Sequence, residues 1–349
     1  MKKNNRLLIL IVVILIIWNV ILTAVIFNKK EQEINQTNIN ETVVTGFSTD
    51  LSKVIDQTKA GVVVIETNNA LSSGFIYSSN DDATYVVTTC HSVNDVSYLK
   101  VVFASGASYD ASVLGKDIFA DIAVLKVDTN IETTPISLGN SDLLKDGEFL
   151  VCIGTPKNAQ YTYSNEMAIV SSKLRTITNS IEFDNSQYEY YESVIQLSSQ
   201  VSEGYSGSPI INMNGEVQGV ITMKDDVAVF ALPINEVKIV ANNIINGEEY
   251  SKMQFGYKGV LVSSLENYEK NQLNIPLDVN SGLYINNVRI TGIASSAGLK
   301  IGDVLLSINN VSINSYADLL NIEYTKTDSF TFVVNRNNEE ISLVGSIND

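Results

Sequence analysis

Short runs of apolar and β-branched residues, separated by turn-forming residues, fill the chain from about residue 50 to residue 246. Runs of this kind are typical of β-strands, and so many of them within about 200 residues favour sandwiches or barrels. Helical periodicity is brief, at residues 51–58 before the first run and residues 235–245 after the last. We therefore predict one mainly β domain over residues 49–247. Its predicted strands are residues 62–65, 74–77, 85–87, 99–103, 122–127, 149–153, 167–170, 194–197, 210–211, 217–222 and 227–232.

The pattern changes after residue 255, where strand-like and helix-like segments alternate. Two short helical segments are predicted, the first opening a helix and turn at residues 295–303 and the second at residues 316–322. This alternation indicates a separate, small α+β domain over residues 255–345. Its predicted strands are residues 260–262, 283–285, 288–290, 304–308 and a closing strand at residues 329–335.

An apolar run from Leu7 to Phe27 precedes both domains and is broken only by Asn19 and Thr23. At about 1.5 Å per residue it spans about 31 Å, the thickness of a bilayer core. The run is long for a signal peptide, and no small-x-small cleavage site follows it. We therefore predict a single transmembrane anchor at residues 7–27, a cytoplasmic tip at residues 1–6 and a polar linker at residues 28–48, with both domains outside the cytoplasmic membrane.

Charge and composition exclude several classes of function. The formal net charge is −16, so the protein would repel a phosphate backbone, and we expect no nucleic-acid partner. One histidine, no pair of cysteines at ligand spacing and no acidic calcium-type loop argue against a metal site. There is no glycine-rich phosphate loop either, and we expect no cofactor.

Candidate chemistry is concentrated at three residues. Ser206 lies in a tight turn between Gly204 and Gly207, just ahead of a predicted hairpin. His91, the only histidine, and Asp121 each stand beside a predicted strand. The order His, Asp, Ser is that of the chymotrypsin-type triad, in which serine attacks, histidine takes its proton and aspartate orients the histidine.

The two cysteines add little to this picture. Cys90 is adjacent to His91, but neighbouring residues on a strand point to opposite faces, which argues against a Cys-His pair. Whether Cys90 and Cys152 form a bridge stays open. An α/β-hydrolase would need Gly-x-Ser-x-Gly and the order Ser, Asp, His, and Ser208 interrupts that motif.

At this point the chain resembles the HtrA/DegP-like serine proteases over essentially everything after residue 50. The resemblance implies a chymotrypsin-like double β-barrel followed by a C-terminal PDZ domain, and a membrane-anchored serine endopeptidase that cleaves misfolded or exported proteins. It supports the triad of His91, Asp121 and Ser206 and suggests a homotrimer. The motifs that carry it are Thr88–Val93, Asp121–Val127, Ile153–Pro156, Ala168–Ser171, Gly204–Pro209, Phe230–Ile234 and Ala297–Asn309.

The same resemblance assigns further site residues. The backbone N–H groups of Gly204, Tyr205 and Ser206 would form the oxyanion hole. Gln200, six residues before the nucleophile, would lie at the base of the S1 pocket, where it predicts no preference for Lys or Arg. The carboxylate loop of the PDZ domain would be Tyr257, Lys258, Gly259 and Val260, which would hold C-terminal peptides added as an extra strand.

Several positions depart from the family pattern. Tyr205 replaces Asn and is expected to overhang the cleft, and Ser208 replaces Gly and is expected to stiffen the turn. Residues 157–193 are predicted to hold regulatory loops, because Ser186–Tyr191 and the residues around it match none of the family motifs. The departures leave a second hypothesis, in which the chain is a weak or inactive protease-like binder or chaperone of unfolded or C-terminal peptides.

Overall fold

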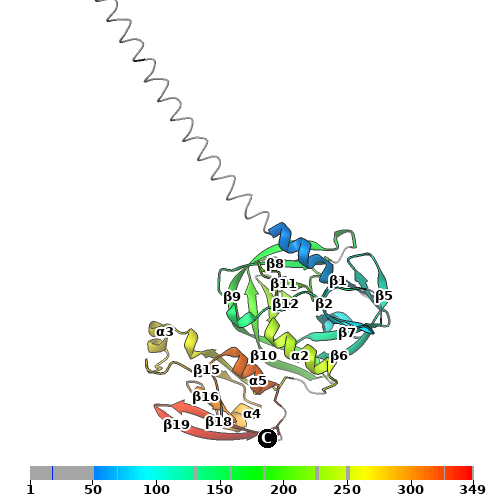
Figure 1. The fold of residues 1–349 in the computed structure, drawn as a ribbon. Coiled ribbons are helices and arrows are strands. Elements are labelled where there is room, and N and C mark those ends of the chain that lie inside the picture. Colours follow the sequence, from blue (N-terminus) through cyan, green and yellow to red (C-terminus); the bar gives the residue numbers. More distant parts are fainter. Residues whose placement is uncertain are drawn as a thin grey trace, which may run out of the picture. The chain divides into compact units, whose positions relative to one another are not determined.

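The computed structural model describes Trp18 and residues 51–68, 70–128, 132–156, 159–183, 186–224, 228–248, 252–325 and 327–347 (Figure 1). The predicted anchor and linker, residues 7–27 and 28–48, therefore lie outside the described residues, apart from Trp18. In the part that is described, no helix is both long enough and apolar enough to cross a membrane. The chain divides into two compact units, residues 1–54 and 55–349, and all of the described strands lie in the second.

The first sheet has seven strands in the order β5-β4-β1-β2-β3-β7-β6. Strands β3 and β7 run antiparallel with Thr89 opposite Ile122, so the residues that follow β3 lie next to those that precede β7. The predicted helix at residues 51–58 is present and runs into the 3-10 helix η1 (Lys59–Gly61). The strands are β1 (Val62–Thr67), β2 (Leu71–Ser79), β3 (Ala83–Thr89), β4 (Leu99–Phe103), β5 (Ser108–Asp110), β6 (Ser112–Asp117) and β7 (Ile122–Asp128).

The second sheet is a closed barrel in the order β10-β13-β12-β11-β8-β9. The resemblance implies two barrels. Among the described strands, the second sheet closes into a barrel, and the first is an open seven-stranded sheet. The short 3-10 helices η3 (Ser141–Leu143) and η4 (Ala159–Tyr161) flank β8. The barrel strands are β8 (Phe149–Gly154), β9 (Ser164–Phe183), β10 (Ser186–Leu197), β11 (Pro209–Ile211), β12 (Val217–Lys224) and β13 (Val229–Pro233).

Most of residues 157–193, where regulatory loops were predicted, is strand rather than loop. Strands β9 and β10 pair in one long antiparallel hairpin, with Phe183 opposite Ser186. The pairing keeps its register from that end down to Val194 opposite Arg175, and it shifts only beyond Val194. Polar residues fill much of the hairpin, which hid its strand character, because cross-strand pairing does not require an apolar side chain at every second position.

Helix α2 (Ile234–Ile245) follows the barrel, where the periodicity predicted it. It packs on β12 of the second sheet and on β6 and β7 of the first. A side chain at Gly115 on β6 would collide with Ile244, so the close approach of helix and strand depends on that glycine. The helix therefore packs against both sheets of the mainly β domain.

The C-terminal domain is α+β, as predicted, and Figure 1 shows it in yellow to red. Its sheet has the order β14-β15-β16-β18-β19, with β17 paired to β16. The strand at residues 329–335 is not the closing one, because β18 pairs along its length with one further strand, β19. The elements are β14 (Tyr257–Leu261), η5 (Val262–Ser264), α3 (Asn267–Gln272), β15 (Leu283–Val288), α4 (Ile293–Ser296), β16 (Val304–Ile308), β17 (Val311–Ser312), α5 (Tyr316–Glu323), β18 (Ser329–Arg336) and β19 (Glu339–Ser346).

Candidate active site

His91 and Asp121 are brought together by the register of β3 and β7. His91 opens the 3-10 helix η2 (His91–Val93), directly after β3. Its Nδ1 lies 2.6 Å from Asp121 Oδ2, and its backbone N–H donates to Asp121 Oδ1 at 2.9 Å. The Cys90 N–H donates to the Asp121 carbonyl oxygen at 3.0 Å. These three contacts fix the imidazole on the carboxylate, which is the geometry of a histidine oriented by an aspartate.

Asp121 is held in an unusual backbone conformation, with φ at 51°. The turn before it is closed by Asp117, whose Oδ1 accepts the N–H groups of Phe119 at 2.9 Å and Ala120 at 3.1 Å. Asp117 is 3% exposed, and burial raises its pKa although these N–H bonds act to lower it. A left-handed φ is sparsely populated for a non-glycine residue, so the turn needs this support.

The predicted nucleophile lies in a turn of the expected form. Gly204 and Gly207 have φ of 99° and 84°, in the left-handed region that favours glycine. The Ser208 N–H donates to the Tyr205 carbonyl at 2.9 Å, and the Gly207 N–H donates to the Ile221 carbonyl of β12 at 2.8 Å. A side chain at Gly207 would also collide with the backbone of β2. Among the hydrogen bonds of the described residues, none joins Ser206 to His91.

Tyr205 does not overhang the cleft, contrary to the expectation from sequence. Its side chain is 1% exposed and belongs to the apolar core of the second barrel, with neighbours such as Leu150 and Ile210. Gly154 provides the space, because a Cβ there would meet the Tyr205 ring and the Ser208 hydroxyl. Tyr205 thus anchors the turn from below. Ser208 is also fully buried, so neither departure from the family pattern obstructs the cleft.

A cleft of about 380 Å³ opens beside His91 and Asp121. Most of the residues that line this cleft were not predicted from the sequence. They come from the polar β9–β10 hairpin and from positions next to the predicted motifs. Glu192 is the least expected: it is 2% exposed, its Oε2 accepts from Asn179 Nδ2 at 3.2 Å, and its Oε1 has no hydrogen-bond partner. The other lining residues are Cys90, Asn94, Ile118, Asn179, Ser180, Thr222 and Met223.

The electrostatics of the cleft favour histidine over cysteine as its base. Partial desolvation acts to lower the pKa of His91, but the hydrogen bond and charge of Asp121 outweigh it, and the net pKa is raised. Burial and the nearby Asp121 raise the pKa of the Cys90 thiol to about 11. Cys90 and Cys152 are both free thiols in the structure, so the open question of a bridge is answered for this state. Within the described residues, no group of three His, Cys, Asp or Glu is arranged to hold a metal ion.

The remaining predicted site residues lie just after β10 and on β14. Gln200 follows β10, and its side chain is exposed. Its place at the base of an S1 pocket stays a prediction. Tyr257 begins the edge strand β14 and is buried, with its ring stacked on Phe255 at 5.6 Å between centroids. The predicted carboxylate loop is thus largely strand, with a register shift between Lys258 and Gly259.

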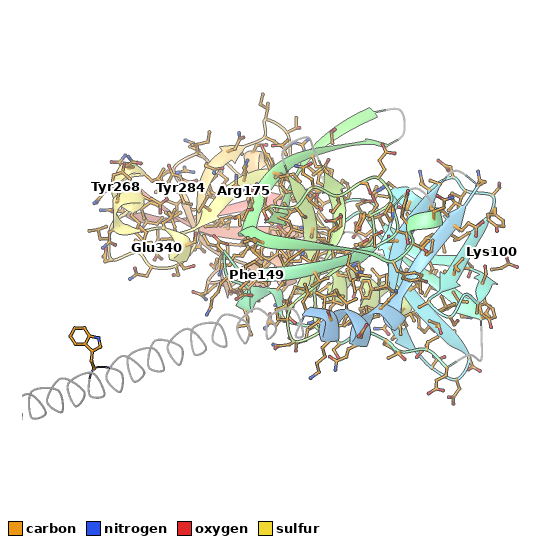
Figure 2. The ribbon with its side chains drawn as sticks, turned by 90° about the horizontal axis from the view of Figure 1, so that it is seen from above. Lys100, Phe149, Arg175, Tyr268, Tyr284 and Glu340 are labelled. Carbon is orange, nitrogen blue, oxygen red and sulfur yellow. The ribbon has the colours of Figure 1, made fainter. Side chains whose placement is uncertain are left out.

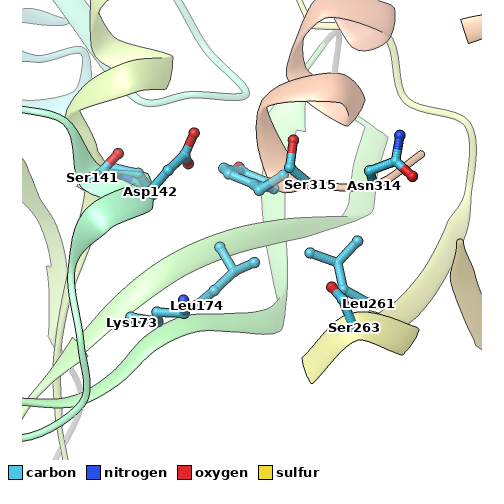
Figure 3. A pocket seen from close by; sticks show the side chains of 10 residues that line it. Ser141, Asp142, Lys173, Leu174, Leu261, Ser263, Asn314 and Ser315 are labelled. Carbon is cyan, nitrogen blue, oxygen red and sulfur yellow. The ribbon is translucent and has the colours of Figure 1, made fainter. Parts of the chain in front are cut away.

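A second cleft, of about 510 Å³, lies along this edge strand. The PDZ side supplies Lys258, Gly259 and Val260 together with Leu319 of α5, and β9 supplies residues that include Arg175, labelled in Figure 2. Figure 3 shows a smaller cavity, of about 210 Å³, which also has β9 as one wall. Its lining residues include Ser141, Asp142, Lys173, Leu174, Leu261, Ser263, Asn314 and Ser315. Because β9 lines both spaces, a peptide along β14 would touch the second barrel as well.

Comparisons with known proteins agree with this architecture. The family descriptions "Trypsin-like peptidase domain" and "PDZ domain" match residues 72–220 and 251–329. The "Serine protease Do-like HtrA" of Lactobacillus helveticus is 29% identical over 282 residues, which cover 78% of this chain and 67% of that protein. The protein of the same description from Bacillus subtilis (strain 168) is 30% identical over 290 residues, covering 79% of this chain but 63% of its own length. Against a "Serine protease HtrA-like" of Staphylococcus epidermidis, the chain spans only 49% of the relative.

Solved structures show the same fold. The "HtrA-type protease AlgW with tripeptide" superposes with a TM-score of 0.59 at 23% identity, over 84% of this chain and 95% of that one. The order of the two matched domains agrees with the descriptions of the named relatives. Together these matches support an HtrA-like serine protease, with a trypsin-like peptidase domain followed by a PDZ domain.

Proposed function

We propose that the chain is an active, membrane-anchored serine endopeptidase with His91, Asp121 and Ser206 as its triad. The observation that carries the proposal is the 2.6 Å contact between His91 Nδ1 and Asp121 Oδ2 at the wall of an open cleft. The nucleophile turn supports it, because both of its glycines have the positive φ that such a turn needs. The burial of Tyr205 and Ser208 also supports it, because neither side chain projects into the cleft.

In the proposed mechanism Ser206 Oγ attacks the peptide carbonyl while His91 Nε2 accepts its proton. Asp121 keeps the proton of the imidazole on Nδ1 and stabilises the imidazolium that forms. The N–H groups of Gly204, Tyr205 and Ser206 bind the developing oxyanion, and one such donor contributes about 3 kcal/mol. His91 then protonates the leaving amine. In the second half of the reaction, His91 takes a proton from water, the water attacks the acyl-enzyme, and His91 returns the proton to Ser206 Oγ. The Ser206–His91 hydrogen bond forms with substrate present, as apo sites often have it long.

The setting of the enzyme is part of the proposal. Residues 7–27 anchor it with the N-terminus in the cytoplasm, so that the peptidase and PDZ domains face misfolded or exported proteins outside the membrane. The PDZ domain binds C-terminal peptides along β14, with Tyr257 to Val260 near the carboxylate. Gln200 gives the S1 pocket no charge, so that uncharged side chains are preferred at P1. The assembly is a homotrimer, as the resemblance suggests.

Labelling with a fluorophosphonate probe tests the triad. The ectodomain from residue 45 onward should label, and the variants Ser206→Ala and His91→Ala should not, because the probe reacts only with an activated serine. Ser202→Ala, at an exposed serine four residues before the nucleophile, is the matched control and should label like wild type. If wild type stays unlabelled even with denatured protein or a C-terminal peptide added, the chain is the inactive peptide binder instead.

A further inference from the structure

Ser73, on β2, is the point where the nucleophile turn is tied to the first sheet. Its side chain is fully buried. The Ser73 hydroxyl donates to the Gly204 carbonyl at 2.9 Å and accepts from the Thr155 N–H at 2.8 Å. The Ser73 N–H donates to the Ser206 carbonyl at 2.9 Å. One serine therefore contacts the turn on both sides of Tyr205.

We propose that the Ser73 hydroxyl is a positioning group that holds the Gly204 backbone in the conformation needed to bind the oxyanion. The inference rests on the proposed function of Ser206 and extends it to a residue that touches neither substrate nor the reacting atoms. Ser73 acts through the backbone of Gly204 and Ser206.

The need for such a clamp follows from Gly204 itself. Glycine has the greatest backbone freedom of any residue, and Gly204 adopts a φ of 99°. Rotation about its bonds would turn its N–H away from the oxyanion while leaving Ser206 in place. A hydrogen bond to the Gly204 carbonyl restricts that rotation. Preorganised donors are effective because they do not reorganise during the reaction.

The strand that leads to His91 is bound to the same point. The Thr88 hydroxyl, near the end of β3, donates to the Ser73 carbonyl at 2.7 Å. Gly207 packs so closely on Ser73 that a Cβ there would collide with its carbonyl oxygen. The backbone of Ser73 therefore sets the distance between the nucleophile turn and β3, and its hydroxyl sets the orientation of the turn.

The chain contains a matched control in the neighbouring residue. Ser72 is on the same strand and 7% exposed, and its hydroxyl is buried without a hydrogen-bond partner. Successive side chains of a strand point to opposite faces, so Ser72 faces away from the turn. Ser72→Ala and Ser73→Ala remove the same atom from the same strand, but only Ser73→Ala removes the bond to Gly204.

The test is active-site titration of the ectodomain, followed by peptide hydrolysis expressed per titrated serine. For Ser73→Ala we expect a kcat per titrated site about 10- to 100-fold below wild type, with KM changed less than about threefold, because one oxyanion contact is misplaced rather than removed. Affinity for a peptide boronic acid, which mimics the tetrahedral state, should fall by the same factor. Ser72→Ala should match wild type in all three measurements.

The possible outcomes separate the two levels of inference. A wild-type protein without a titratable serine removes the proposed function and this inference with it. A titratable wild type with Ser73→Ala within twofold of it overturns the positioning role alone. A loss confined to the titrated fraction shows that Ser73 only supports folding, and also overturns it. If Ser73→Ala does not fold, Ser73→Cys, with a weaker donor, should give an intermediate rate, and a wild-type rate there would reject the proposal.

Discussion

Replacing Glu192 by glutamine should make the protein more stable at neutral and alkaline pH. Glu192 is 2% exposed and has one hydrogen bond, from Asn179, while its Oε1 has none. Burial, together with the charge of Glu236, raises its pKa from 4.5 to about 8. Glutamine keeps the size of the side chain and removes the titrating proton.

The sign and size of the effect follow from the two pKa values. The folded protein keeps a proton on Glu192 that the unfolded chain releases, so stability falls as pH rises from about 4.5 to about 8. At about 1.4 kcal/mol per pH unit, the full difference corresponds to roughly 5 kcal/mol at most. Between pH 5 and pH 8, wild type should therefore lose about 3 kcal/mol relative to Glu192→Gln.

Urea unfolding at a series of pH values measures this difference directly. The free energies of unfolding of wild type and Glu192→Gln should diverge steadily between pH 5 and pH 8, whereas Glu248→Gln, at an exposed glutamate, should run parallel to wild type. Parallel curves for wild type and Glu192→Gln would show that the carboxyl is not held in its neutral form, and the reasoning from burial would fail.

Two further predictions concern the histidine and the contact between domains. Asp121 raises the pKa of His91 above 6.5 although partial desolvation acts against it. Because the base must be neutral, the acid limb of kcat/KM should have its midpoint above about pH 6.5, and a midpoint at or below pH 6 would contradict this. The Tyr316 hydroxyl donates to Glu236 Oε2 at 2.6 Å, and Glu236 is fully buried. Tyr316→Phe should therefore cost about 1.5–3 kcal/mol in urea unfolding, while Tyr268→Phe, at a side chain that is 69% exposed, should cost much less.

The sequence carries clearer signals for the residues of the proposed triad than for the walls of the cleft around them. Glycines on both sides of Ser206 and a lone His91 beside a strand are local signals, and the structure has the turn and the strand end where those signals stand. Glu192 gave no such signal, because its burial depends on the pairing of β9 with β10 and on charges from distant segments. A carboxylate on a polar hairpin looks exposed until the fold places apolar and charged groups around it.

Tyr205 shows the reverse error, in which a residue beside the nucleophile was expected to project into the cleft. Direction within a tight turn depends on the φ of its neighbours, and the left-handed glycines on either side turn Tyr205 into the barrel core. Gly154, at the end of β8, leaves the space that the Tyr205 ring fills. The sequence alone does not show this, because it does not show that β8 passes under the turn. Side-chain direction in a glycine-rich turn is thus a tertiary property.

Asp117 links the turn before Asp121 to the segment that enters the PDZ domain. One carboxylate oxygen closes the turn before Asp121, and the other accepts the Lys252 N–H at 3.2 Å. The Lys252 ammonium lies 2.7 Å from Glu236 and 3.3 Å from Glu323, in a cluster that α5 completes. Removing one member of a buried ion pair leaves an uncompensated charge. The loss of Lys252, Glu236 or Glu323 should therefore destabilise the whole cluster. The buried carboxylate of Asp117 therefore accepts hydrogen bonds both from the turn that leads to Asp121 and from Lys252, at the start of the PDZ segment.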